Sequence, residues 1–252
     1  MPWNMMREVW DYCTYNMPFF ILILALFVLL NYIQDYYKNP NGYLVLLVVV
    51  LMAFLIYGYG MLITRDRIKG GVRLPKIIIK DVLDLGIKST IVFIVYISVQ
   101  GFVMHGISSP LHFPDFELEE LLLNIPHTVK LVFSHSPVDS LIFFVVGAIL
   151  FYILAFFMEI GLARLAYTGR ILSAFNLLDI KRDIDLIGWK HYAKEYTIMI
   201  VSIVVFLSLG YIVIPDIFLN YVWNTVLFLF AFATQFLGIG GIYSEVIAVK
   251  SE

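Results

Sequence analysis

The stretch from Ile217 to Tyr243 contains no charged side chain. It is longer than the roughly 20 apolar residues that cross the hydrocarbon layer of a bilayer as an α-helix. Such a segment has to be helical, because a helix satisfies every backbone amide without help from water. The whole chain is 61% hydrophobic and only 14% charged. A soluble domain of this length needs a larger polar surface, so these values indicate a polytopic membrane protein.

Six segments are long and apolar enough to span the membrane, and they make residues 1–252 a single polytopic, all-α integral membrane domain. The last segment exceeds the length of one perpendicular span, so it is either strongly tilted or loosened near Gly238–Gly241. The first is expected to be retained, because Arg7, Glu8 and Asp11 precede it instead of a basic signal-peptide region. The predicted spans are residues 17–36, 43–63, 89–107, 140–163, 196–215 and 217–243.

Lys and Arg lie almost entirely on one side of these spans. Of the 17 basic residues, only Lys38 and Lys130 fall in segments on the other side. Because Lys and Arg accumulate in cytoplasmic loops, the basic side is predicted to be cytoplasmic. With an even number of spans, both termini then face the cytoplasm, as expected for a multi-pass protein of the cell membrane. The longest outer loop, residues 108–139, is acidic.

The densest basic segment, "RDRIKGGVRLPK", follows the second predicted span. Gly70 and Gly71 are expected to end that helix, since glycine tolerates backbone angles that other residues avoid. Leu74 is expected to anchor in the membrane interface, and Pro75 suits the first position of a new helix, where its missing N–H costs nothing. Apolar residues at helical spacing then predict an amphipathic helix over about 76–88 that lies in the plane of the membrane.

A second in-plane amphipathic helix is predicted over about 174–194 on the same side. Four apolar residues, Leu177, Ile180, Ile184 and Ile187, share one face of this helix. The opposite face is expected to be charged and solvated, and it carries Asp179, Lys181, Arg182, Asp183 and Asp185.

The two inner segments also resemble each other. Five residues of the first recur in the second at one constant spacing, and each segment consists of a span, a basic turn, an amphipathic stretch and another span. Two such units in the same orientation would form a parallel internal repeat about an axis near the membrane normal. Chance agreement between Leu- and Gly-rich segments is the alternative, and the sequence leaves both open. The matched pairs are Gly58 and Gly161, Leu62 and Leu165, Arg67 and Arg170, Ile68 and Ile171, and Leu74 and Leu177.

From the second span onward the chain resembles a known family. The pattern "YGYGMLITRDRIKGGVRLPK", followed by "GLARLAYTGRILSAF", is similar to an archaeal-type multi-pass membrane protein family of unknown function, domain of unknown function 4013. The resemblance implies a six-span bundle and supplies no activity. One departure is Lys76-Ile77 after the Leu-Pro, where an acidic or aromatic residue is expected. The positions that carry the resemblance are Gly58, Tyr59, Arg67, Gly70 or Gly71, Leu74, Pro75, Arg170, Ala174 and Phe175.

Polar side chains inside predicted spans are candidate functional groups, because burying them in a membrane is costly. Glu159 lies five residues before Arg164. It is expected to pair with Arg164 or to snorkel to the interface, and the alternative is a proton- or cation-linked role. Gln235 is expected to make an interhelical hydrogen bond, and the same holds for Gln100, His105, Asn220 and Asn224.

The sequence carries no catalytic motif: His-Glu-x-x-His, Gly-x-Ser-x-Gly, a P-loop and Gly-x-Gly-x-x-Gly are all missing. We therefore expect no catalytic residue, no enzymatic activity and no cofactor. The single cysteine, Cys13, excludes an internal disulfide and is expected to be a structural residue in a terminal segment. The net charge of −2 gives no indication of nucleic-acid binding. No metal site is expected, because no compact zinc spacing relates His105, His112, His127 and His135.

The clustered positive charges define the candidate binding site. The basic residues of the two inner segments are predicted to contact anionic lipid headgroups or an acidic partner helix, unless they serve only to set orientation. We therefore expect a non-enzymatic helical bundle that contacts the lipid bilayer and binds a membrane or cytoplasmic partner. A transporter or permease component is the alternative, and a membrane-embedded lipid enzyme is a third. The predicted binding residues are Arg65, Arg67, Lys69, Arg73, Arg170, Lys181 and Arg182.

Overall fold

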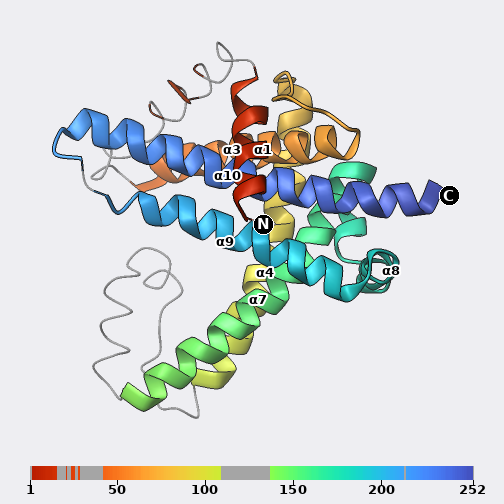
Figure 1. The fold of residues 1–252 in the computed structure, drawn as a ribbon. Helices are drawn as coiled ribbons and strands as arrows, with labels where there is room; N and C mark the ends of the chain where they lie inside the picture. The colour runs from red at the N-terminus through yellow and green to blue at the C-terminus, as the bar shows by residue number, and fades with distance from the viewer. Residues whose placement is uncertain are drawn as a thin grey trace. The chain divides into compact units, whose positions relative to one another are not determined.

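A computed structural model shows a helical protein, with no strand among the residues that it describes. It describes residues 2–15, 21, 24, 25, 28, 42–108, 137–212 and 214–251. Contacts group the chain into two compact units, one formed by Met1–Val92 with Glu159–Glu252 and the other by Phe93–Met158. The helices are α1 (Pro2–Thr14), α3 (Gly42–Ile68), α4 (Ile79–Ser108), α7 (Pro137–Thr168), the 3₁₀ helix η2 (Ile171–Ala174), α8 (Leu177–Ile187), α9 (Trp189–Leu209) and α10 (Ile217–Ser251), as Figure 1 shows.

Four helices in the described part of the chain are long and apolar enough to cross a membrane. They are Ile79–Gly106, Leu141–Thr168, Trp189–Leu209 and Phe218–Ser251. These helices contain or overlap the spans predicted at 89–107, 140–163, 196–215 and 217–243. Four such helices indicate a membrane-embedded helical protein. The prediction at 43–63 lies within α3. The prediction at 17–36 lies outside the described residues, apart from single positions.

The prediction of a separate in-plane helix over 76–88 is wrong. Residues 71–78 are not helical, and α4 then runs without a break from Ile79 into the predicted span. Pro75 therefore lies in this non-helical segment and not at the first position of a helix. Neither Lys88 nor Ser89 ends the helix. The amphipathic part before Ser89 and the apolar part after it therefore form one helix, α4.

The helix predicted over 174–194 is divided into two at Gly188. This residue has a φ of 85°, a left-handed conformation that glycine adopts without steric cost. Residues on its N-terminal side form α8, and those after it begin α9. The two inner segments therefore differ locally: an irregular stretch follows α3, whereas η2 and α8 follow α7.

The helix α10 is continuous over its 35 residues, so the predicted loosening near Gly238–Gly241 is not observed. It packs against α3, α9 and α1 within the first unit (Figure 1). Its glycines permit this crowding. A Cβ atom at Gly238 would lie 2.6 Å from the side chains of Met199 and Met5, and one at Gly240 would lie 2.9 Å from the carbonyl oxygen of Thr64.

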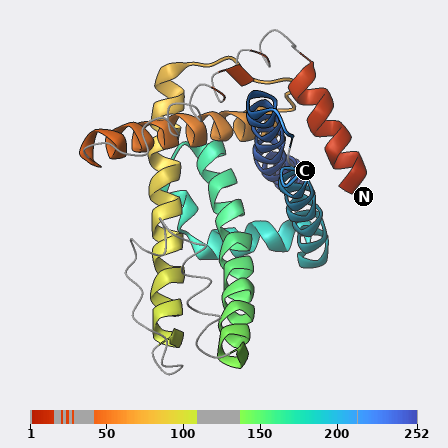
Figure 2. The same cartoon turned by 90° about the vertical axis from the view of Figure 1, so that its left-hand side faces the viewer.

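The described part of the second unit contains the later part of α4 and the earlier part of α7. These two stretches lie side by side in Figure 2, and a Cβ atom at Gly147 would be 3.0 Å from the Met104 side chain. Large apolar side chains of the unit point outward; Phe102, for example, is 80% exposed. Such a surface suits contact with lipid acyl chains rather than water.

Candidate functional site

Two of the predicted binding residues, Arg65 and Arg67, have partners inside the protein. The Arg65 Nε donates to the Ala166 carbonyl at 2.8 Å, in the last turn of α7. Lys88 adds a second cation at this helix end, with its Nζ 3.0 Å from the Gly169 carbonyl. Positive groups stabilise a helix C-terminus by bonding its free carbonyls and by favourable interaction with the helix dipole. Arg67 forms an ion pair with Glu8 of α1.

The segment from Lys69 to Lys80 presents charges that remain exposed. It is held at Leu74, which is buried in the protein instead of the membrane interface as predicted, and at Pro75, whose carbonyl accepts a hydrogen bond from the Tyr59 hydroxyl at 3.3 Å. Gly70 ends α3 with a φ of 83°, and a Cβ atom at Gly71 would collide with the Asp66 carboxylate at 1.7 Å. The exposed basic residues, without an ion pair among the described residues, are Lys69, Arg73, Lys76 and Lys80.

Apolar side chains are exposed in the same segment. Ile78 is 56% exposed and Ile79 is 67% exposed, and Val72 and Ile77 are also exposed. A water-facing loop gains nothing from displaying branched apolar residues between lysines. The combination is typical of a segment that inserts apolar side chains below lipid headgroups and leaves its cations at headgroup level.

The segment from Arg170 to Arg182, which begins directly after α7, shows the same combination. Leu172 and Leu178 are each more than three-quarters exposed, and Leu177, predicted on the apolar face of α8, is exposed as well. Arg170, Lys181 and Arg182 are exposed. The Lys181 and Arg182 ion pairs with Asp185 and Asp179 measure 3.8 and 3.6 Å, and such exposed pairs leave most of the charge available.

Beneath this segment lies a buried ionic network that the sequence did not indicate. Arg164 donates to Asp183 at 2.5 Å and to Asp179 at 3.0 Å. Asp183 also accepts hydrogen bonds from Lys250 at 2.6 Å and from Tyr243 at 3.1 Å. The prediction that Asp183 lies on a solvated face of α8 is therefore wrong, because this carboxylate is only 1% exposed. Asp183 lies three residues after Ile180 and four before Ile187, so helical spacing places it on the same face as these isoleucines. Donors from α7 and α10 allow its burial there.

The N-terminal helix α1 packs against α9 and α10 within the first unit and was not predicted. Val9, Tyr12 and Cys13 are buried, and their i, i+3, i+4 spacing is the signal that could have identified the helix. The Tyr12 hydroxyl donates to Asp66 at 2.9 Å. Burial, with the nearby Asp66 carboxylate, raises the pKa of Tyr12, and burial raises the pKa of the Cys13 thiol to about 12. Cys13 is thus a packed structural residue rather than a reactive thiolate.

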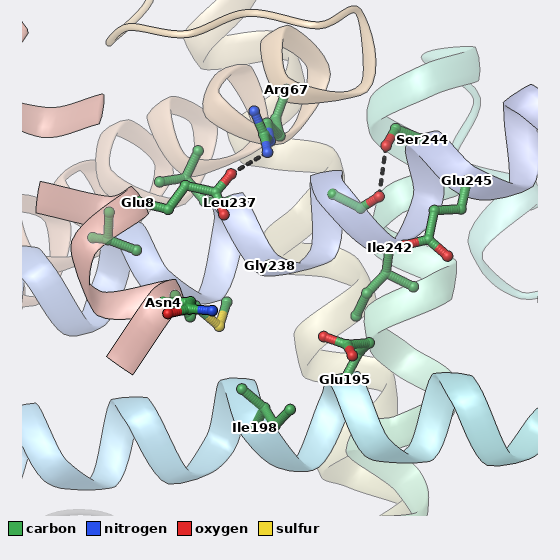
Figure 3. A pocket seen from close by; sticks show the side chains of 13 residues that line it. Asn4, Glu8, Arg67, Glu195, Ile198, Leu237, Gly238, Ile242, Ser244 and Glu245 are labelled. Carbon is green, nitrogen blue, oxygen red and sulfur yellow. Dashed lines mark hydrogen bonds and ion pairs between the residues drawn. The ribbon is translucent and has the colours of Figure 1, made fainter. Parts of the chain in front are cut away.

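A cavity of about 410 Å³ lies between α1, α9 and α10 at the end of α3 (Figure 3). Gly238 and Gly241 form part of its wall, and α1 closes one side. Its charged side chains already have partners: Glu8 pairs with Arg67, Glu195 with Lys194 at 3.7 Å, and Glu245 with His191 at 2.9 Å. Because these charges are matched, the lining does not by itself indicate a ligand.

Two of the polar residues predicted inside spans, Glu159 and Gln235, contact each other. The Gln235 Nε2 donates to the Glu159 Oε1 at 2.9 Å, which joins α10 to α7. The predicted pairing of Glu159 with Arg164 is wrong, because Arg164 faces Asp179 and Asp183. Among the described residues no three His, Cys, Asp or Glu side chains are close enough to hold a metal ion. His112, His127 and His135 lie outside the described residues.

Comparison with known proteins gives one match. A family model described as a protein of unknown function, DUF4013, matches residues 42–221. No curated protein and no solved structure matches the chain. The matched region covers α3 to the first residues of α10, including both inner basic segments. Since the match extends over well more than half of the chain, this protein belongs to the DUF4013 family.

Proposed function

We propose that this protein is a non-enzymatic, multi-pass membrane protein that binds anionic phospholipid headgroups at the cytoplasmic leaflet. The binding surface is formed by the Lys69–Lys80 and Arg170–Arg182 segments. One observation carries the proposal: exposed isoleucines lie directly beside exposed, unpaired Arg73, Lys76 and Lys80 in the described part of the chain.

The energetics favour lipid over free solvent. Each Lys or Arg at an anionic leaflet contributes on the order of 1 kcal/mol, which salt screens. Burying an isoleucine side chain that is about half exposed adds a comparable amount. The bonds from Arg65 and Lys88 to the end of α7 hold the two segments together, so their charges act on one area of leaflet.

The proposed topology has six spans, with both termini and both segments on the cytoplasmic side. The distribution of Lys and Arg along the sequence supports this arrangement. A parallel repeat would place the two segments at equivalent positions. One structural feature supports a repeat. Gly58 approaches the backbone of Val82, and its counterpart Gly161 approaches the backbone of Ala174, so each glycine contacts the chain that follows its own helix.

The test replaces two free cations of the first segment, Arg73→Gln with Lys76→Gln, and measures bound phosphatidylglycerol by native mass spectrometry from mixed micelles. Loss of two contacts is expected to lower occupancy roughly tenfold or more at low ionic strength, with a smaller effect in high salt. The matched control is Lys190→Gln with Lys194→Gln on α9, which removes the same charge from the same predicted side and should leave occupancy unchanged.

Three outcomes contradict the proposal. Unchanged lipid occupancy in the first variant would mean that the segment serves orientation only. An equal decrease in both variants would mean that net charge, not this surface, attracts the lipid. Retained lipid binding, with loss of a co-purifying soluble acidic protein, would identify a cytoplasmic partner as the ligand instead.

A transporter or permease component is the second candidate, and one observation favours it. Glu159 is an acidic side chain buried within a helix that is long enough to span the membrane. Intramembrane carboxyl groups of this kind mark proton and ion pathways in transport proteins. A proton-dependent flux in reconstituted vesicles that Glu159→Gln abolishes would support this candidate over the first.

A further inference from the structure

Glu159 occupies an unusual position for an acidic residue. It lies in α7, within the candidate span Leu141–Thr168, and is only 4% exposed. Its hydrogen-bond partner is the Gln235 side-chain amide, a neutral group on α10. The other carboxyl oxygen, Oε2, is buried and has no hydrogen-bond partner among the described residues.

Among the residues that the structure describes, no positive charge lies against Glu159 to balance an ionised carboxylate. Arg164, the nearest basic residue along α7, is engaged by Asp179, Asp183 and the Ser173 carbonyl. The titratable group that interacts with Glu159 from the neighbouring helix α3 is Tyr57, which carries no positive charge. Gln235 is the contact from α10.

Burying a carboxylate without a counter-charge strongly disfavours the ionised form, and the penalty is larger when one oxygen lacks a donor. A neutral carboxylic acid avoids the charge penalty and leaves only one uncharged polar atom unmatched. A metal cation is a poor alternative, because hard cations take six or more oxygen ligands and the described contacts supply one carboxyl group and one amide.

We infer that Glu159 is a proton-binding site inside the membrane-spanning part of the protein, with Gln235 as the hydrogen-bond partner of the protonated carboxyl. The ligand is a single proton, held at neutral pH. When the proton leaves, the charge that remains between α7 and α10 has to be solvated, so the contact between these helices loosens. This site is independent of the lipid-binding surface, and each can fail without the other.

Infrared spectroscopy of the full-length protein in lipid tests the inference. At neutral pH the wild-type protein should show the C=O stretch of one protonated carboxyl group, shifted in D₂O, and Glu159→Gln should lack it. Glu195→Gln on α9 is the matched control, because its side chain is 34% exposed and pairs with Lys194, and it should retain the band.

Loss of a carboxylate band in Glu159→Gln, with no change in the protonated-carboxyl region, would overturn the inference. Glu159→Met serves as the second variant if the glutamine protein does not fold, since Met has a similar volume and fits apolar surroundings. It should lack the same band. Raising the pH should convert the wild-type band to a carboxylate signal while the spectrum of Glu159→Met stays constant in that region.

Discussion

The buried carboxylate of Asp183 is stabilised by donor groups from two other helices. It receives a guanidinium from α7, an ammonium and a phenol from α10, and it lies on α8 itself. Its two oxygens are therefore fully matched by donors from elements far apart in the sequence. Removing one member of such a group is much more damaging than replacing the whole group by apolar side chains, because the remaining charges lose their compensation.

The first prediction concerns this residue. Asp183→Ala should lower the free energy of unfolding by roughly 3–5 kcal/mol, since Arg164 is then buried without its closest partner. Thermal unfolding in detergent micelles measures the effect. The control is Asp185→Ala on the same helix, whose side chain is 48% exposed. Its contacts, an ion pair with Lys181 at 3.8 Å and a hydrogen bond from the Trp189 indole at 2.6 Å, are also exposed, so the change should cost no more than about 1 kcal/mol. Equal shifts in the two variants would contradict a network centred on Asp183.

The backbones of α3 and α4 approach each other closely where these helices cross. A Cβ atom at Gly58 would lie 1.9 Å from the Val82 carbonyl oxygen, and one at Gly86 would lie 1.9 Å from the Phe54 carbonyl oxygen. Each helix thus uses a glycine to admit the backbone of the other. Small residues at such crossings allow apolar helices to gain close van der Waals contact in a membrane, where hydrophobic association is weak.

The second prediction follows from this crossing. Gly58→Ala should destabilise the protein by about 2–3 kcal/mol, because a backbone carbonyl cannot move aside as a flexible side chain could. Gly101→Ala in α4 is the control: nothing lies within 4 Å of its added Cβ, so it should be neutral or stabilise the helix by up to about 1 kcal/mol. The measurement is again thermal unfolding, and a stable Gly58→Ala protein would disprove the close α3–α4 contact.

Over the whole molecule, the distribution of Lys and Arg is expected to set how the chain is inserted in the membrane. All Lys and Arg except Lys38 and Lys130 lie in segments that an even number of spans would bring to one side. Some of these cations also have structural roles, such as the caps that Arg65 and Lys88 place on α7. We therefore expect a change at Arg65 to affect both the packing of α7 and the orientation of the chain.

The third prediction is the topology. Single cysteines introduced as Lys69→Cys and Arg182→Cys should react with an impermeant maleimide only after permeabilisation, and Glu119→Cys should react in intact cells. Cys13 needs no replacement, because it is fully buried and its raised pKa keeps the thiol neutral at physiological pH. Because the pKa of Cys13 is higher in the folded protein than the ordinary thiol value of 9.0, the buried neutral thiol contributes to stability fully below pH 9. This contribution to the free energy of unfolding is lost as the pH rises from 9 toward 12. If Glu119→Cys reacted only after permeabilisation, the predicted membrane topology would be wrong.

Local pattern and composition were enough to determine the helical class, the approximate position of the apolar helices and the gathering of positive charge. Each of these depends on residues close together in the chain: an uncharged run has to be helical in a bilayer, and a glycine in a left-handed conformation ends a helix wherever it occurs. The end of α3 before Gly70 follows from the segment itself.

Only the tertiary structure decided which charged side chains form ion pairs within the protein and which stay exposed. Arg67 and Lys76 belong to one basic run, yet Arg67 pairs with Glu8 from a helix far away in the chain, while Lys76 remains exposed. Glu159 is bonded to Gln235 of α10 rather than to Arg164 of its own helix. Periodicity assigns a residue to a face of its helix, but the partner depends on which other helix covers that face, and this is settled by contacts that no local pattern encodes.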